Sequence, residues 1–198
     1  MISIGLTGNA GSGKSLVARL WKEERGAVVI DADELGRSAV KPGSEALAEL
    51  TRLFGKEILL ADGSLNRKRT AEIAFSNAEN TRALNSIVHP EIIRNINRQL
   101  KEAGREGVKA VVVDAALIFE FGFERYVDVV VVVDAPRELK ISRMLAKGKM
   151  DRKTVEKVIE VQLPADELKK RADYIIDNSG EIDNLKKKAL ELFDSLVR

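Results

Sequence analysis

The residues with the clearest chemistry lie in the segment GNAGSGKS, residues 8–15. The spacing G-x-x-x-x-G-K-[ST] of a Walker A loop is met at Gly8, Gly13, Lys14 and Ser15. Glycines let successive backbone N–H groups turn into one concave nest for phosphate oxygens. The lysine adds positive charge at the β- and γ-phosphates, and the serine hydroxyl can ligate Mg²⁺. The loop therefore predicts a nucleoside triphosphate site formed by Gly8, Asn9, Ala10, Gly11, Ser12, Gly13, Lys14, Ser15 and Leu16.

Two carboxylates follow the second apolar segment, in the string IDAD at residues 30–33. Ligands of open α/β sheets lie beyond the carboxyl ends of the strands, so Asp31 and Asp33 are expected near the γ-phosphate. Asp33 is the candidate general base for an attacking hydroxyl, and Asp31 is the candidate that orients it or holds a metal-bound water. The alternative is an N-cap for a helix that starts near Glu34, which needs only one of the two.

A third carboxylate ends the apolar run VVVD at residues 111–114, the loose Walker B pattern. Any buried strand that ends in aspartate fits this pattern, so Asp114 gains weight only from the Walker A loop beside it. The predicted Mg²⁺ ligands are therefore Ser15, Asp31 and Asp114. Asp134 ends the next apolar run before Pro136, where a helix cap is the favoured interpretation.

Positive charge gathers around a glycine-broken turn and predicts a mobile lid. The cations are Arg143, Lys147, Lys149 and Arg152. Arg143 is the best catalytic candidate, because a guanidinium on the helix before the turn could fold over the phosphates. A solvated helix face is the alternative for each member of the cluster.

The elements that position these residues alternate between strands and helices. Continuous apolar runs predict buried parallel strands at 2–6, 27–30, 108–114, 127–134 and 173–177. Helical spacing predicts helices at 14–25, 44–54, 67–76, 80–88, 90–103, 137–147, 152–161 and 183–197, two of them opened by Pro90 and Pro136. This order predicts an α/β fold of the P-loop NTPase type, a doubly wound five-stranded parallel sheet.

The spacing of these elements predicts one domain over 1–198 with two insertions. The stretch between the second and third strands holds several helices where a crossover needs one, so 35–104 is predicted to be a helical substrate subdomain. The lid is predicted at 137–171, and the core at 1–34, 105–136 and 172–198.

Composition excludes several classes of protein. Without cysteine and with one histidine, the chain can form no disulfide, thiolate metal site or zinc site. The net charge of +2 is too mild to indicate nucleic-acid binding. The apolar runs are too short to cross a bilayer, and the chain opens on a strand rather than a signal peptide. We expect a cytoplasmic monomer or small homo-oligomer with a small-molecule partner.

Several strings together resemble the dephospho-coenzyme A kinase family over nearly the whole chain. They are residues 4–8, 11–15, 29–33, 54–58, 62–67, 84–90, 117–120, Gln162 before Pro164, and 172–180. The resemblance implies ATP-dependent phosphorylation, with Mg²⁺, of the ribose 3′-hydroxyl of dephospho-coenzyme A. It also implies a coenzyme A-binding role for the helical insertion.

The resemblance assigns roles to particular residues. Asp33 becomes the base, Lys14 the phosphate ligand and Arg143 the transition-state clamp. It adds substrate-binding roles for Asp33, His89, Arg67 and Leu117. Without the resemblance, the position of His89 before Pro90, at a predicted helix-to-helix junction, favours the interpretation that His89 is a packed corner residue.

The sequence departs from the family pattern at three places. Leu16 replaces a usual threonine, Ala116 replaces a common proline, and residues 147–152 lack the usual arginine–acid–glycine turn. Another small-molecule kinase, acting on a nucleoside, nucleotide or sugar, is the nearest alternative function. A GTP switch would need an Asn-Lys-x-Asp string, which the sequence lacks. A catalytically inactive nucleotide-binding module is disfavoured by the joint presence of Lys14, Ser15, Asp31 and Asp33.

Overall fold

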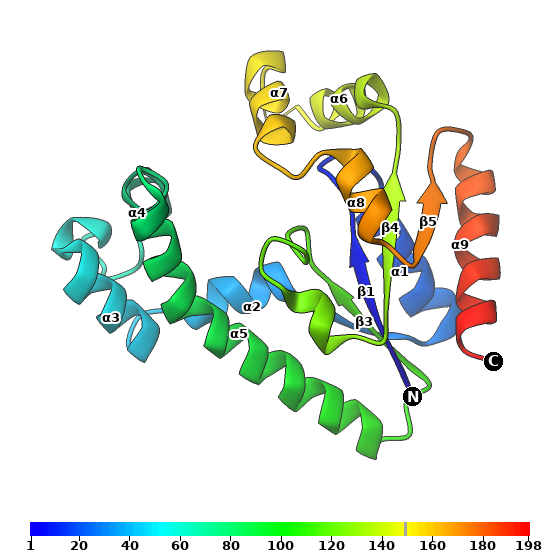
Figure 1. Ribbon diagram of the computed structural model, residues 1–198, viewed down its shortest axis with the longest axis horizontal. Helices are drawn as coiled ribbons and strands as arrows, with labels where there is room; N and C mark the ends of the chain where they lie inside the picture. The colour runs from blue at the N-terminus through cyan, green and yellow to red at the C-terminus, as the bar shows by residue number, and fades with distance from the viewer. Residues whose placement is uncertain (149) are drawn as a thin grey trace. The chain divides into compact units, whose positions relative to one another are not determined.

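The computed structural model describes residues 1–148 and 150–198, which divide into two units (Figure 1). One unit joins Met1–Asp31 to Gln99–Arg198 and contains the sheet. The other, Ala32–Arg98, is mainly helical. Lys149, one of the predicted lid cations, lies outside the described residues.

Within the described residues the first unit has one parallel sheet of five strands, in the order β2-β3-β1-β4-β5. The strands are β1 (Ile2–Thr7), β2 (Val28–Asp31), β3 (Ala110–Asp114), β4 (Val129–Asp134) and β5 (Tyr174–Asp177). The predicted doubly wound α/β fold is therefore confirmed. β2 and β3 lie on one side of β1, and β4 and β5 lie on the other, so the connections switch sides between β1 and β3. Ligands of such sheets bind at this switch point.

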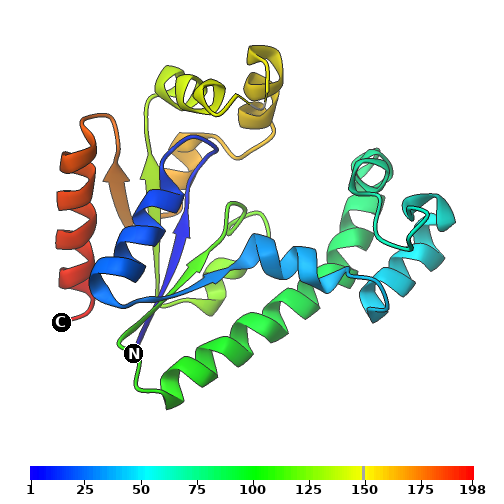
Figure 2. The same ribbon diagram turned by 180° about the vertical axis from the view of Figure 1, so that it is seen from behind.

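Helices cover both faces of this sheet (Figures 1 and 2). The helices α1 (Lys14–Arg25) and α9 (Ile182–Leu196) lie side by side on one face, and α8 (Ala165–Arg171) lies on the other. The buried Trp21 indole of α1 packs against the Phe193 ring of α9, with ring centroids 5.6 Å apart and planes tilted by 47°, and donates its N–H to Ala189 O at 2.7 Å. This contact holds α1 against α9, and buried residues of both helices share one hydrophobic core with the strands β1, β3 and β4.

The remaining elements of the first unit follow β3 and β4. They are η2 (Phe123–Tyr126), α6 (Arg137–Ala146) and α7 (Arg152–Glu160). The buried Ile141 and Met144 of α6 pack against Val155 of α7. Together with α8, these two helices make up the stretch 137–171.

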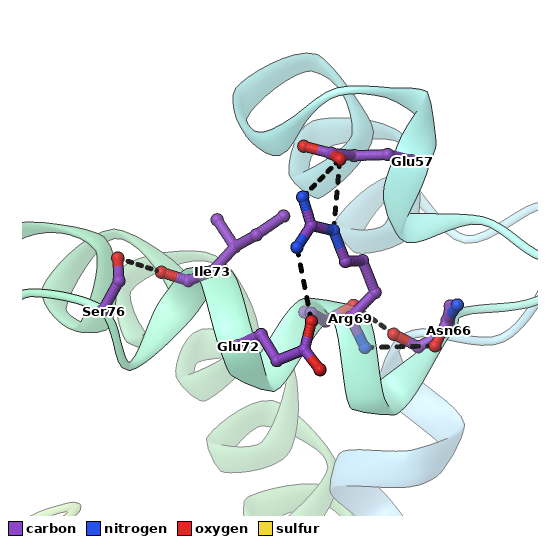
Figure 3. A network of polar contacts seen from close by, with 7 residues as sticks. Glu57, Asn66, Arg69, Glu72, Ile73 and Ser76 are labelled. Carbon is purple, nitrogen blue, oxygen red and sulfur yellow. Dashed lines mark hydrogen bonds and ion pairs between the residues drawn. The ribbon is translucent and has the colours of Figure 1, made fainter.

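The helical unit contains α2 (Ala32–Ala39), α3 (Glu45–Phe54), η1 (Lys56–Ile58), α4 (Arg67–Ala74) and most of α5 (Ala78–Arg105). Leu50 of α3 and Ile58 of η1 are completely buried in its core. On the surface, Arg69 of α4 binds Glu57 at 2.6 Å and Glu72 at 3.3 Å (Figure 3). The side chain of Asn66 accepts the Arg69 N–H and caps α4.

The predicted break between helices at Pro90 is wrong. A single helix of 28 residues, α5, runs through Pro90. A proline inside a helix removes one hydrogen bond and costs about 3 kcal/mol. The turns beyond it bury Ile92 and Ile96, which offsets that cost. His89 consequently lies in the middle of a helix and not at a junction.

Candidate active site

The phosphate loop lies between the end of β1 at Thr7 and the start of α1 at Lys14, as predicted. In the described part of the chain, the N–H groups of Gly11, Gly13, Lys14 and Ser15 have no protein acceptor. Donors at a helix N-terminus, reinforced by the helix dipole, form an anion site. The loop therefore has a shape that can receive phosphate oxygens.

Two glycines are required by the close approach of neighbouring elements behind the loop. Gly11 has φ +82° and Gly13 has φ +101°, values that favour glycine. A Cβ at Gly11 would lie within 3.0 Å of the Lys140 backbone, and one at Gly13 would lie within 3.0 Å of the Asn178 side chain. The loop is thus supported by α6 and by the residues that follow β5.

Lys14 forms an ion pair with Asp114 at the carboxyl end of β3. Both side chains are 14% exposed, so solvent screens the pair only partly. Asp31 at the end of β2 is the register partner of Asp114 in the adjacent strand. The first unit therefore brings together Lys14 and two of the three predicted metal ligands.

The predicted Mg²⁺ ligands fit this ion chemically. Carboxylates and a hydroxyl supply the hard oxygen ligands that Mg²⁺ prefers. No three His, Cys, Asp or Glu side chains cluster to hold a metal anywhere in the described residues. Mg²⁺ at this site would therefore depend on phosphate oxygens and water for most of its coordination, as is usual for this ion.

Arg143 is connected to the phosphate loop through one intervening residue, Asn178. Its Nη2 donates to the backbone oxygen of Asn178 at 3.1 Å and to Oδ1 of Asn178 at 3.2 Å. Asn178, 4% exposed, in turn donates Nδ2 to Ser12 O at 2.7 Å. In the sequence, Asn178 belongs to the string 172–180 that resembles the family, and no local pattern predicts a role for it.

Two buried donors at this place have no protein partner in the described residues: Nη1 of Arg143 and the Ser12 hydroxyl. Buried polar groups in native proteins are almost always hydrogen-bonded. Their presence beside the phosphate loop is consistent with a polar ligand that would complete them.

The predicted cap role of Asp134 is wrong. Pro136 occupies the N-cap position of α6 without a side-chain cap bond. Asp134 instead binds the ammonium of Lys140 at 2.9 Å, and Lys140 also reaches Asn9 Oδ1 at 3.3 Å. Lys140 is 3% exposed, so its charge needs this pairing. The pair connects α6 and β4 to the phosphate loop.

The other predicted lid cations have different surroundings. Arg152 binds Glu138 at 2.9 Å and Glu156 at 2.8 Å, on an exposed face. Lys147 is exposed at the C-terminus of α6. These contacts favour the solvated-face interpretation for Arg152 and leave Arg143 as the catalytic candidate.

Three predicted residues belong to the helical unit, which is described by itself. Asp33 is exposed in the first turn of α2, inside the helix and not ahead of it as an N-cap would be. Arg67 is exposed at the first position of α4. His89 is half-buried on α5, and burial lowers the pKa of its imidazole.

A cavity of about 560 Å³ lies among α2, α3 and α5 of the helical unit. Its lining includes Lys41, Glu45 and Arg94 but not Asp33, Arg67 or His89. Leu117, the fourth predicted substrate residue, is half-buried in the first unit, just after β3. The four predicted substrate residues are therefore not gathered in this cavity.

Known proteins of one family are similar to this chain over nearly its whole length. The family model described as dephospho-CoA kinase matches residues 2–184. A dephospho-CoA kinase of Corynebacterium diphtheriae is 45% identical over 190 residues, covering 96% of this chain and 94% of that protein. A crystal structure from Thermus thermophilus is 34% identical, with TM-score 0.84, covering 100% of this chain and 98% of that one.

A more distant solved structure supports the fold. Dephospho-CoA kinase from Campylobacter jejuni is 23% identical, with TM-score 0.72, covering 98% of this chain and 96% of the other. The family model and the curated relatives match nearly the whole chain, so the likeness is not confined to the phosphate loop. The chain therefore belongs to the dephospho-CoA kinase family and is a kinase.

Proposed function

We propose that the protein transfers the γ-phosphoryl group of ATP to the ribose 3′-hydroxyl of dephospho-CoA, giving CoA and ADP. The observation that carries this proposal is the phosphate loop, whose backbone donors and Lys14 are arranged for a triphosphate in a chain of this family. Phosphoryl transfer depends mostly on positioning and on charge stabilisation, which such a loop supplies.

In the proposed mechanism, Asp33 accepts the proton of the attacking hydroxyl. Lys14 and the loop N–H groups bind the negative charge of the transferring group. Ser15, Asp31 and Asp114 are the residues that would hold Mg²⁺, which supplies further charge neutralisation when bound. The stretch 137–171 is proposed as the lid that keeps water away from the γ-phosphate.

We propose that Arg67, His89 and Leu117 contact the acceptor. The lowered pKa of His89 favours a neutral imidazole at neutral pH, with one donor and one acceptor nitrogen. Arg67 would supply a cation for the diphosphate of the acceptor. Leu117 would supply an apolar contact.

The proposed partner is this small-molecule acceptor. In the described residues no helix is both long enough and apolar enough to span a membrane. The cytoplasmic location and the monomeric or small homo-oligomeric state stay predictions.

A coupled assay tests the proposal. Purified protein with ATP, Mg²⁺ and dephospho-CoA should release ADP and form CoA in equal amounts. Nucleosides and sugars at the same concentration serve as competing acceptors. Faster phosphorylation of one of these would overturn the proposed substrate.

Replacement of Arg143 tests the clamp. Arg143→Ala should lower kcat by about 10²-fold and change the KM for dephospho-CoA far less, because a contact that strengthens in the transition state affects mainly kcat. Steady-state kinetics with each substrate varied in turn would measure this. Arg152→Ala is the matched control, because it removes a guanidinium that, in the described residues, is paired with two surface glutamates. Equal kinetic effects of the two variants would contradict the assignment.

A further inference from the structure

The two residues between α7 and α8 that follow Val161 are bound to the phosphate loop. Gln162 Oε1 accepts the Ala10 N–H at 2.9 Å, and Leu163 O accepts Nδ2 of Asn9 at 3.0 Å. The N–H of Leu163 donates to Glu120 Oε1 at 3.3 Å. We call these five residues, Asn9, Ala10, Glu120, Gln162 and Leu163, the Gln162 junction.

The bond from Ala10 to Gln162 fixes the peptide group between Asn9 and Ala10. A trans peptide is planar, so its N–H and its C=O point in opposite directions. The C=O of this peptide accepts the N–H of Ser12 at 3.0 Å, which closes the apex of the loop. Turning this peptide would break both hydrogen bonds at once. In the orientation that Gln162 holds, the N–H groups of the residues after Ala10, which are Gly11, Gly13, Lys14 and Ser15, remain available for phosphate.

Apolar contact fixes Ala10 as well. Its side chain packs against the cluster of Ile141, Met144 and Val155, which joins α6 to α7. Ala10, at the apex of the loop, therefore contacts α6 and α7 through its side chain and Gln162, after α7, through its N–H. A displacement of this stretch would be transmitted to the Asn9–Ala10 peptide.

We propose that Gln162 is a positioning residue for phosphoryl transfer. Through the Ala10 N–H it holds the phosphate loop in its receptive conformation and makes the loop and the residues after α7 move as one body. The inference rests on the proposed kinase activity, and the wild-type assay distinguishes failure of that activity from failure of this inference.

Gln162→Ala should lower kcat by about 10- to 100-fold, because misplaced donors stabilise the transition state less. The KM for dephospho-CoA should stay within about threefold of wild type, because the junction contains none of the proposed acceptor residues. Gln162→Glu keeps an oxygen that can accept the Ala10 N–H, so it should restore kcat to within about threefold of wild type. Its added negative charge beside the triphosphate should raise the KM for ATP, and added salt should weaken that rise.

Gln99→Ala is the matched control, because Gln99 is the other of the two glutamines in the sequence and lies on α5. It should leave all kinetic constants unchanged. Melting temperatures of all variants separate positioning from folding. Wild-type kinetics in Gln162→Ala would overturn the proposal. Failure of Gln162→Glu to restore kcat, at an unchanged melting temperature, would also overturn it.

Discussion

Asp33→Asn is expected to lower kcat by about 10²- to 10⁴-fold, the effect of removing a general base. The amide keeps the shape of the side chain and loses the charge that accepts the proton of the acceptor hydroxyl. ATP binding, measured by equilibrium titration, should change little. Pre-steady-state release of ADP on mixing with both substrates would show that the chemical step is slowed.

The neighbouring Glu34 offers a matched control, because it shares the first turn of α2 with Asp33. An acidic residue in a first turn stabilises its helix by about 0.3–1 kcal/mol, so Glu34→Gln reproduces that loss without removing the proposed base. Its kcat should stay close to wild type. A larger loss in Asp31→Asn than in Asp33→Asn would exchange the roles assigned to the two carboxylates.

Lys14→Ala is expected to lower kcat by about 10²- to 10³-fold, because an electrostatic donor of this kind acts most strongly as charge develops on the transferring group. It should also raise the KM for ATP, because Lys14 is paired with a neighbouring carboxylate. Lys14 neutralises Asp114, and its removal leaves that carboxylate beside the bound triphosphate. Initial rates over a range of ATP concentrations would measure both changes.

The second effect can be separated by the double variant Lys14→Ala with Asp114→Asn. ATP affinity measured by equilibrium titration without Mg²⁺ should recover in part once the unpaired carboxylate is removed, because the repulsion of the triphosphate is lost. The kcat with Mg²⁺ should stay low, because Asp114 is also a proposed Mg²⁺ ligand. No recovery would show that Asp114 does not act through its charge on this site. Unchanged turnover in Lys14→Ala would place the catalytic site away from the phosphate loop.

Most of the fold was predictable because local pattern and tertiary position agree. Each predicted strand lies within two residues of the observed one at either end. The central strands β1, β3 and β4 are buried on both faces and are therefore continuously apolar. The helix α8 was not predicted, because its seven residues, ADELKKR, carry no apolar period. The break at Pro90 was predicted from the proline alone. Burial of Ile92 and Ile96 after it stabilises the continuous helix.

The positions of the phosphate loop between β1 and α1 and of Asp114 at the end of β3 were predictable, because each lies in a motif that carries its own chemistry. The functional roles of these residues stay predictions. The supports of the phosphate loop were not predictable. Lys140 lies in an amphipathic helix, where a lysine indicates a solvated position, yet it is buried against Asp134. The contacts of Asn178 and Gln162 join residues more than 150 positions apart, and no local period reports such a contact. A signal did exist in the unexplained family strings around both residues.

The strand order has a consequence for synthesis on the ribosome. Ile2 of β1 pairs with Ala110 of β3, so the central strand emerges without either neighbour. At about 5–20 residues per second, the roughly 100 residues between them take about 5–20 s to make. The contiguous unit Ala32–Arg98 can complete its own contacts during that interval. The phosphate loop is among the first segments translated, but it gains its final support only when Asn178 leaves the exit tunnel.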